Sequence, residues 1–153
     1  MVELVLPNDA NTMGNVLGGR VLHWMDLAAA IVAHRHCRTE AVTASMDEVS
    51  FLAPIRVGQL AVVTARMTYV GRTSMEIRVD VQSEDLMSGE RRQTSTAYLT
   101  FVAVDKGGLP TNVPPLLYET EDEKREARAA EARRAKRLGD RSLDMSPRES
   151  QQR

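Results

Sequence analysis

The chain contains almost no cysteine and has no long apolar run. Cys37 is its only cysteine, so an intrachain disulfide and a disulfide-stabilised secreted scaffold are excluded. No apolar run approaches the roughly 18 residues of a membrane-spanning helix. The first nine residues, MVELVLPND, are acidic and too short for a signal peptide. We therefore expect a cytoplasmic protein with no membrane partner.

An excess of charge of either sign is also missing. The chain has 20 lysines and arginines against 21 aspartates and glutamates, a formal net charge of −1. This balance gives no general attraction to nucleic acid or to an anionic membrane. Basic residues concentrate near the C-terminus, where acidic residues alternate with them, so no nucleic-acid partner is expected. With 153 residues, 42% of them hydrophobic, the chain can bury one real core.

The most informative stretch runs from Asn11 to Ala33 and reads NTMGNVLGGRVLHWMDLAAAIVA. After the Gly18-Gly19 pair, apolar residues recur three and four positions apart, which predicts an amphipathic helix from about Gly18 to His36. These residues are Val21, Leu22, Met25, Ala29, Val32 and Ala33. One carboxylate, Asp26, lies among them. Buried carboxylates are rare unless they are paired or take part in chemistry, so Asp26 is the first candidate functional residue.

The remaining periodicity predicts strands. A short apolar segment, Glu3 to Leu6, precedes the helix, and four further strands follow it. They are expected from Ala41 to Phe51, from Gln59 to Val70, from about Met75 to Gln82 and from Thr94 to Val104. The turns between the last four are too short for parallel crossovers. The predicted fold class is α+β: a five-stranded antiparallel sheet wrapped around one long central helix, in the order β-α-β-β-β-β.

The composition changes after a proline-rich connection at residues 110–115. Beyond it, alanines and charged residues predominate and large apolar side chains are few. Thr120 and Glu123 have the spacing of a helix capping box, and Leu138-Gly139 is typical of a helix end. We therefore expect a principal domain at residues 1–118 and a charged tail at residues 119–153 that is helical or disordered.

Two interpretations of Gly18-Gly19 stay open. The stretch GNVLGG is neither a Walker A loop nor a dinucleotide fingerprint. The pair either allows the chain to enter the helix, or leaves the first helical N–H groups open to a ligand oxygen, such as a carbonyl that becomes an oxyanion. Asp26 lies about 11 Å further along the helix. Either Asp26 is satisfied by neighbouring hydroxyls or amides, or a second copy with an antiparallel helix completes a shared site.

The histidines are weak candidates for chemistry. His34 and His36 are two positions apart, so on a helix they point in different directions and make a poor metal pair. Cys37 beside His36 forms no Cys–His dyad. Zinc signatures and a serine nucleophile elbow are also missing. We expect no metal, and structural or surface roles for the histidines.

Four blocks, in this order, resemble the hotdog-fold acyl-CoA thioesterases, the group of the bacterial acyl-CoA hydrolases and the brain-type cytosolic acyl-CoA hydrolase. They are PNDANTMGNVLGGRVLHWMD, VTASMDEVSFLAPIRVGQL, VGRTSMEIRVDV and TFVAVDKGGLPTNVPPL. The resemblance implies the hotdog fold, a functional homodimer that often assembles into a hexamer as a trimer of dimers, and hydrolysis of acyl-CoA to a free fatty acid and CoA. It implies no cofactor, because coenzyme A is part of the substrate.

The resemblance also implies roles for individual residues. The family's catalytic aspartate matches Asp26 and its loop asparagine matches Asn11, and opposite subunits contribute them to each site. Our hypothesis for the mechanism is that the thioester carbonyl binds backbone donors at Gly18 or Gly19 and that Asp26 activates water as a general base, with direct attack on the thioester as the alternative. The residues that match the family's segment near the CoA moiety are Gly71, Arg72, Thr73 and Ser74. Thr43 and Ser45 are expected to line the pocket.

Two other functions fit parts of the sequence. Acyl-thioester dehydratases and hydratases share the fold, but they typically combine a histidine with a carboxylate, and the loop before this helix has no histidine. A non-catalytic acyl-CoA-binding module would sense its ligand without hydrolysing it. The preferred acyl-chain length, the choice between dimer and hexamer, and the role of Asp26 as base or nucleophile stay open.

Overall fold

The computed structural model describes residues 1–144, which belong to two compact units: residues 1–116 and a unit that begins at Leu117. The first unit contains one long helix, α1 (Gly18–Cys37), and a short 3₁₀ helix at Pro7–Asp9. Its strands are β1 (Val2–Leu4), β2 (Glu40–Phe51), β3 (Leu60–Val70), β4 (Ser74–Glu84) and β5 (Arg91–Val104).

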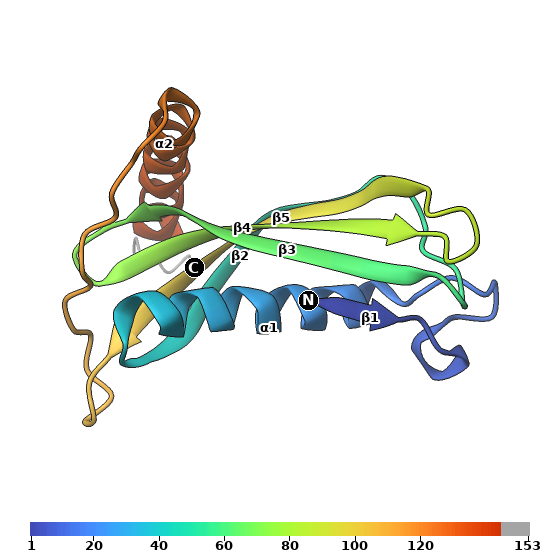
Figure 1. The fold of residues 1–153 in the computed structure, drawn as a ribbon. Helices are drawn as coiled ribbons and strands as arrows, with labels where there is room; N and C mark the ends of the chain where they lie inside the picture. Colours follow the sequence, from blue (N-terminus) through green and yellow to red (C-terminus); the bar gives the residue numbers. More distant parts are fainter. Residues whose placement is uncertain (145–153) are drawn as a thin grey trace, which may run out of the picture. The chain divides into compact units, whose positions relative to one another are not determined.

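The five strands form one antiparallel sheet in the spatial order β1-β3-β4-β5-β2. Helix α1 crosses one face of this sheet and contacts β2, β3, β4 and β5 (Figure 1). The predicted α+β architecture, with its single long helix and its element order, is confirmed. The 12-residue strand β2 lies at one end of the sheet, so among the described residues only β5 pairs with it.

The core lies between α1 and the sheet. Alternation along β4 turns Met75, Ile77, Val79 and Val81 towards the helix, and all four are fully buried. Helix α1 packs against these strands through a buried stripe of mostly small side chains. They are Val21, Trp24, Met25, Ala28, Ala29, Ala33 and Cys37. Alanine at three of these positions lets the helix approach the strands closely. The alternating pattern that predicted β4 is therefore the pattern that builds the core.

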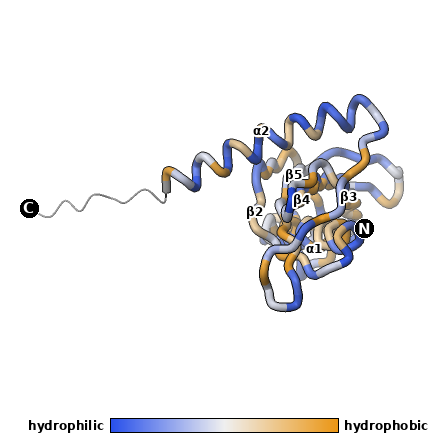
Figure 2. The backbone as a smooth tube through the Cα atoms, turned by 90° about the vertical axis from the view of Figure 1, so that its left-hand side faces the viewer, coloured by the Kyte–Doolittle hydropathy of each residue, from blue (hydrophilic) through white to orange (hydrophobic). Residues whose placement is uncertain are grey.

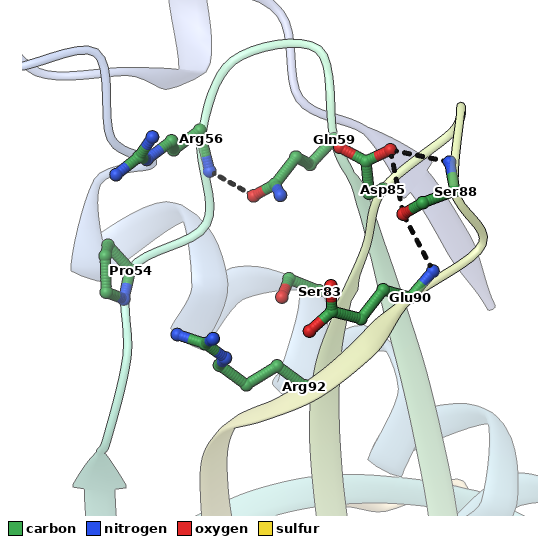
Figure 3. A pocket seen from close by; sticks show the side chains of 8 residues that line it. All are labelled: Pro54, Arg56, Gln59, Ser83, Asp85, Ser88, Glu90 and Arg92. Carbon is green, nitrogen blue, oxygen red and sulfur yellow. Dashed lines mark hydrogen bonds between the residues drawn. The ribbon is translucent and has the colours of Figure 1, made fainter.

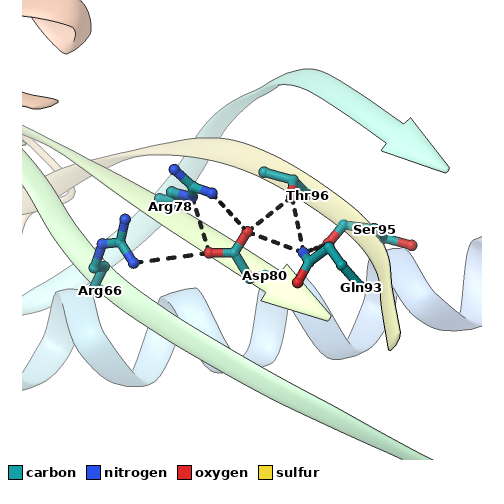
Figure 4. Close-up of polar contacts among 6 residues, drawn as sticks. All are labelled: Arg66, Arg78, Asp80, Gln93, Ser95 and Thr96. Atoms are coloured by element: carbon teal, nitrogen blue, oxygen red, sulfur yellow. Dashed lines mark hydrogen bonds and ion pairs between the residues drawn. The ribbon is translucent and has the colours of Figure 1, made fainter. Parts of the chain in front are cut away.

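The opposite face of the sheet carries a polar network around Asp80, whose side chain is 18% exposed. The carboxylate accepts hydrogen bonds from Arg78 Nε at 2.9 Å, Thr96 Oγ1 at 2.8 Å and Gln93 Nε2 at 3.2 Å (Figure 4). Arg66 adds an ion pair at 3.9 Å. These hydrogen bonds and this ion pair give the Asp80 carboxylate partners. Polar side chains can therefore occupy alternate positions of the central strands.

The second unit contains helix α2 (Glu121–Asp144), which is largely hydrophilic along its length (Figure 2). The predicted capping box is confirmed: the Glu123 amide donates to Thr120 Oγ1 at 3.1 Å, and Glu123 Oε2 accepts from the Thr120 amide at 3.1 Å. The predicted end at Leu138-Gly139 is wrong, since one glycine in a helix costs only about 1 kcal/mol and the helix continues. Residues 145–153 of the expected tail lie outside the described part.

Neither helix within residues 1–144 is both long and apolar enough to cross a bilayer. Helix α1 has the length, but its sequence includes Arg20, Asp26, Arg35 and three histidines.

The capping box makes the start of α2 sensitive to acid. The amides of Glu119 and Thr120 hold the pKa of Glu123 below its ordinary value of 4.5. A carboxylate with a lowered pKa in the folded state stabilises the helix above pH 4.5, and this contribution disappears as the pH falls through the lowered value. We predict that the protection factors of the Glu119, Thr120 and Glu123 amides, the ratios of intrinsic to observed exchange rate, fall below pH 4.5. Glu123→Gln should remove this acid dependence; an unchanged pH profile in that variant would contradict the assignment.

Candidate active site

The N-terminus of α1 offers two unpartnered backbone donors. Its N-cap residue, Leu17, has no side-chain capping bond, while its carbonyl accepts from the amides of Arg20 and Val21. Within the described residues, the amides of Gly18 and Gly19 have no acceptor. A Cβ added at Gly19 would meet no atom within 4 Å, so this backbone lies against open space. A ligand oxygen can therefore approach these amides, where the positive end of the helix dipole adds to their attraction.

Asn11 organises the loop in front of that helix. Its side-chain oxygen accepts hydrogen bonds from the amides of Met13 at 2.9 Å and Asn15 at 3.2 Å. Backbone bonds from Val57 to the Gly14 carbonyl and from Val16 to the Ile55 carbonyl then anchor the loop to the segment after β2. Because the Asn11 carbonyl is committed to the loop, its NH2 group is the part that can donate to a substrate or a water molecule.

Asp26 lies midway along α1 and is only half-buried, in contrast to the buried position that its apolar neighbours suggested. Thr43 Oγ1 on β2 donates a hydrogen bond of 2.7 Å to Asp26 Oδ1. This contact orients the carboxylate and leaves its second oxygen, Oδ2, for another donor. The structure thus brings Asp26 and Thr43 together, as expected for residues that line one site.

Ser45 does not join them. Strand β2 contains irregularities between Thr43 and Ser45 and between Asp47 and Ser50, and each shifts the register against β5. Thr43 pairs with Phe101 and Ser45 with Thr100, two adjacent residues on opposite faces of β5. The Ser45 hydroxyl instead donates to Asp47 Oδ2 at 3.0 Å. The expectation that Thr43 and Ser45 share a pocket wall fails because a bulge between them reverses the alternation.

The Gly71–Ser74 segment forms the tight turn between β3 and β4. The Gly71 amide donates to the Ser74 carbonyl at 2.8 Å, and a Cβ on Gly71 would lie only 2.9 Å from Ser74 Oγ. The conformation of the turn therefore accounts for Gly71 without any ligand. Arg72 and Thr73 occupy the tip, and this structure places them away from the start of α1, at the other end of β4 (Figure 1).

Two cations that the sequence did not single out lie near this turn. Arg38 and Lys106 line a cavity of about 600 Å³ together with His34, Thr39, Glu40, Val104, Asp105 and Thr111. Backbone bonds connect Ala103 both to Thr73 and to Thr111, so the cavity adjoins the β3–β4 turn. The two acidic side chains that line the cavity already have partners. Asp105 accepts hydrogen bonds from the amides of its own turn, and Glu40 Oε2 lies 3.4 Å from His34 Nε2.

The side chains of Arg38 and Lys106 have no such partner within the described residues. No sequence motif marks this site. Only the fold brings the end of α1 next to the turn after β5.

Two of the three histidines contact backbone carbonyls. His34 Nδ1 lies 2.8 Å from the Ala30 carbonyl and His36 Nε2 lies 2.8 Å from the Pro114 carbonyl. Cys37 is buried. Within residues 1–144, no three histidine, cysteine, aspartate or glutamate side chains come together as a metal site.

Exposed apolar side chains occur on both elements that carry the Asp26–Thr43 pair. Leu27 and Ile31 on α1 are 44% and 47% exposed, and Val42 and Phe51 on β2 are 51% and 54% exposed. We call these four side chains the apolar strip; two of them belong to β2, whose outer edge has no partner strand among the described residues. Exposed apolar residues next to a long unpaired strand edge are typical of a surface that another protein chain covers.

Comparison with known proteins decides the family. A model of the thioesterase superfamily matches residues 13–90. The chain is also 46% identical, over 119 residues, to an uncharacterized acyl-CoA thioester hydrolase of Bacillus subtilis, an alignment that covers 78% of this chain and 69% of that protein. The chain belongs to the thioesterase superfamily. The family predicted from its four sequence blocks is thereby confirmed.

Solved structures share the fold of this thioesterase. The crystal structure of an acyl-CoA hydrolase from Bacillus cereus superposes with a TM-score of 0.88 at 41% identity, covering 94% of this chain and 88% of that one. The cytosolic acyl coenzyme A thioester hydrolase of Rattus norvegicus is 39% identical over 145 residues, covering 91% of this chain. The chain spans only 38% of the length of that mammalian relative. Other solved relatives are described as hexameric.

One relative has been altered at three positions. The acyl-CoA hydrolase of Staphylococcus aureus, whose structures include complexes with butyryl coenzyme A and coenzyme A, is 32–34% identical to this thioesterase with TM-scores of 0.82–0.84. Alanine mutants of one asparagine, one aspartate and one threonine were solved. In that enzyme the three positions lie 15 and 17 residues apart. Asn11, Asp26 and Thr43 are the same residue types with the same two separations.

The open space at Gly19 gives a prediction that separates the two interpretations of the glycine pair. If the helix needed a small residue there, Gly19→Ala would destabilise the fold. Because an added Cβ meets nothing, we predict that Gly19→Ala leaves the free energy of unfolding unchanged or raises it by up to about 1 kcal/mol, in line with the helix propensity of alanine. Urea denaturation measures the free energy of unfolding. The matched control is Gly139→Ala in α2, because a Cβ added at Gly139 also meets no atom within 4 Å. A loss above 1 kcal/mol would favour the steric interpretation.

Proposed function

We propose that this thioesterase hydrolyses acyl-CoA to a free fatty acid and coenzyme A, with Asp26 activating water at a site that two copies of the chain share. The contact that carries the proposal is the 2.7 Å hydrogen bond from Thr43 to Asp26, together with the exposed apolar strip on the helix and the edge strand. The asparagine, aspartate and threonine mutated in the Staphylococcus aureus enzyme support it, because their types and separations recur here. The relatives' names supply the substrate class.

A shared site follows from the length of the helix. Asp26 is seven residues beyond Gly19, so about 11 Å of helix separates them and one thioester carbonyl cannot contact both within one chain. When a second copy packs against the apolar strip with its helix antiparallel, the start of one helix lies beside the middle of the other. Twofold symmetry then creates two equal sites, each with Asn11, Gly18 and Gly19 from one chain and Asp26 and Thr43 from its partner.

In the proposed hydrolysis each of these groups has one role. The Gly18 and Gly19 amides bind the thioester oxygen and stabilise its charge when it becomes an oxyanion. Asp26 Oδ1 is held by Thr43, while Oδ2 takes a proton from a water molecule that the Asn11 NH2 group orients. The water oxygen bonds to the carbonyl carbon, and the tetrahedral intermediate collapses by breaking the C–S bond. The CoA thiolate leaves and takes the proton that Asp26 had accepted, so Asp26 returns to its charged form.

Thiolate is a good leaving group, so the reaction needs no strong general acid. This agrees with a site in which two histidines of α1, His34 and His36, have structural contacts. We assign the phosphates of CoA to the cations near the β3–β4 turn. Arg72, Arg38 and Lys106 provide the charge there, and guanidinium groups can bind phosphate oxygens in pairs.

The proposed assembly is a homodimer, with a trimer of dimers as the larger form. The hexameric relatives support the larger form, and the cytosolic mammalian relatives support a cytoplasmic location. The dehydratase alternative lacks support, because no histidine accompanies Asp26 in the contacts described above. A binding module without turnover stays a competitor, and activity measurements separate it from an enzyme.

We predict that Asp26→Asn lowers kcat by a factor of 10² to 10⁴, the usual contribution of a general base, with little change in affinity for CoA. Thr43→Val, which removes the hydroxyl and keeps the shape, should lower kcat by a smaller factor because Asp26 loses its orienting bond. Release of thiol from acetyl- to palmitoyl-CoA measures both. Ser45→Ala is the control, since Ser45 bonds to Asp47 on the other face. Wild-type protein that releases no thiol from any acyl-CoA would reject the hydrolase.

A further inference from the structure

A polar pocket of about 290 Å³ lies where β4 and β5 are joined, beside the segment that follows β2 (Figure 3). Three residues between positions 54 and 59 supply one part of its lining, and the β4–β5 turn with the strand residues next to it supplies the other. None of the residues placed in the proposed thioester site lines it. The mechanism above therefore leaves this pocket without a role.

Ser83 is a buried polar residue in the wall of this pocket. Alternation along β4 places it on the face that Val79 and Val81 turn towards the core. Ser83 is 6% exposed, and its hydroxyl has no hydrogen-bond partner among residues 1–144. A hydroxyl that is removed from bulk water without a partner costs free energy. A polar atom of a ligand in the pocket would supply the missing partner.

The charged side chains of the pocket divide into two groups. In Figure 3 the guanidinium groups of Arg56 and Arg92 lie on the left, and the carboxylates of Asp85 and Glu90 lie to the right of them. Asp85 Oδ1 already accepts hydrogen bonds from two amides of its own turn, each at 2.9 Å. The side chains of Arg56, Arg92 and Glu90 have neither a hydrogen bond nor an ion pair within the described residues. The pocket thus presents two unpaired positive charges and one unpaired negative charge, on different sides.

Gln59 adds a neutral donor to the pocket. Its Oε1 atom accepts a hydrogen bond of 2.9 Å from the Arg56 amide, which leaves the NH2 group of the side chain for a ligand. At roughly 30 Å³ for each group of the size of a water molecule, 290 Å³ holds about ten non-hydrogen atoms. The pocket therefore suits a small polar molecule, and a nucleotide or a folded peptide is too large for it.

We propose that this pocket binds a small zwitterion with two acidic groups and one ammonium group, such as an acidic amino acid. The acidic groups bind Arg56 and Arg92, since a guanidinium can donate two parallel hydrogen bonds to a carboxylate. The ammonium group pairs with Glu90, and Ser83 and Gln59 donate to ligand oxygen atoms. A phosphate ion or a simple dicarboxylate would place negative charge beside Glu90 without a counter-charge. An amino acid with a neutral side chain would leave one guanidinium unpaired.

Isothermal titration calorimetry of the full chain tests the proposal with three probes. L-glutamate carries all three charged groups, glutarate lacks the ammonium group, and γ-aminobutyrate lacks one carboxylate. We expect L-glutamate to bind about tenfold more tightly than either analogue, because each analogue loses one hydrogen bond between charged groups. Wild-type protein that binds no L-glutamate, or that binds glutarate equally well, would overturn the proposal.

Three variants assign the contacts. Arg92→Gln should weaken L-glutamate binding about tenfold. Glu90→Gln should weaken it as much and leave glutarate binding as strong as in the wild type or stronger, so the preference for L-glutamate disappears. Ser83→Ala should weaken binding without lowering the free energy of unfolding of the ligand-free protein, because the hydroxyl that it removes has no partner. Arg92 and Glu90 are exposed, so both of those variants should fold.

The matched control is Arg128→Gln, an exposed arginine of α2 that lines none of the cavities described above. It should bind L-glutamate as the wild type does. Unchanged L-glutamate affinity in Arg92→Gln would overturn the proposal. The proposal does not depend on the hydrolase: L-glutamate binding by a protein that releases no thiol would reject the hydrolase alone, and thiol release without L-glutamate binding would reject this site alone.

Discussion

The hydrogen bond between Thr43 and Asp26 connects the helix of this protein to the edge of its sheet, and the rest of the proposed site depends on it. A carboxylate on the middle of a helix needs a partner that fixes its direction, and β2 supplies one because it lies beside α1 at the end of the sheet. Among residues 1–144, the same arrangement leaves the outer edge of β2 unpaired and the apolar strip exposed. The position of β2 at the edge of the sheet therefore has two consequences. It orients the Asp26 carboxylate, and it exposes a surface on which a second chain can pack.

The helix also keeps donors and base apart. Backbone amides that lack partners occur only in the first turn, whereas Asp26 is seven residues beyond Gly19, and a helix cannot bend to close that gap. Because the helix is rigid, the proposed reaction requires a second chain to pack against the apolar strip. The charges agree with the same scheme, because Arg38 and Lys106 line the cavity at the other end of α1. The phosphate-bearing arm of the proposed substrate would meet these two cations.

The sequence predicted a helix or strand well where its apolar residues kept one constant spacing along the whole element. The strict alternation from Met75 to Val81 and the helical spacing after Gly19 both depend on burial against a single neighbour, and both elements were found. Strand β2 was harder. Two register shifts, with Glu48 at a φ of 51° inside the second, break its alternation, and so Ser45 faces away from Thr43. A bulge depends on cross-strand partners that are distant in sequence, so a local pattern cannot locate it. For the same reason the cations Arg38 and Lys106 were missed.

The most direct test of the account is complementation between two inactive variants. Asn11→Ala and Asp26→Asn would be co-expressed in equal amounts and compared with each variant alone. If each site takes Asn11 from one chain and Asp26 from its partner, a mixed dimer has one intact site and one doubly altered site. Random pairing makes half of the dimers mixed, so about a quarter of the wild-type activity should return. Mixed dimers that form and yet show only the residual activity of the two variants would contradict a shared site.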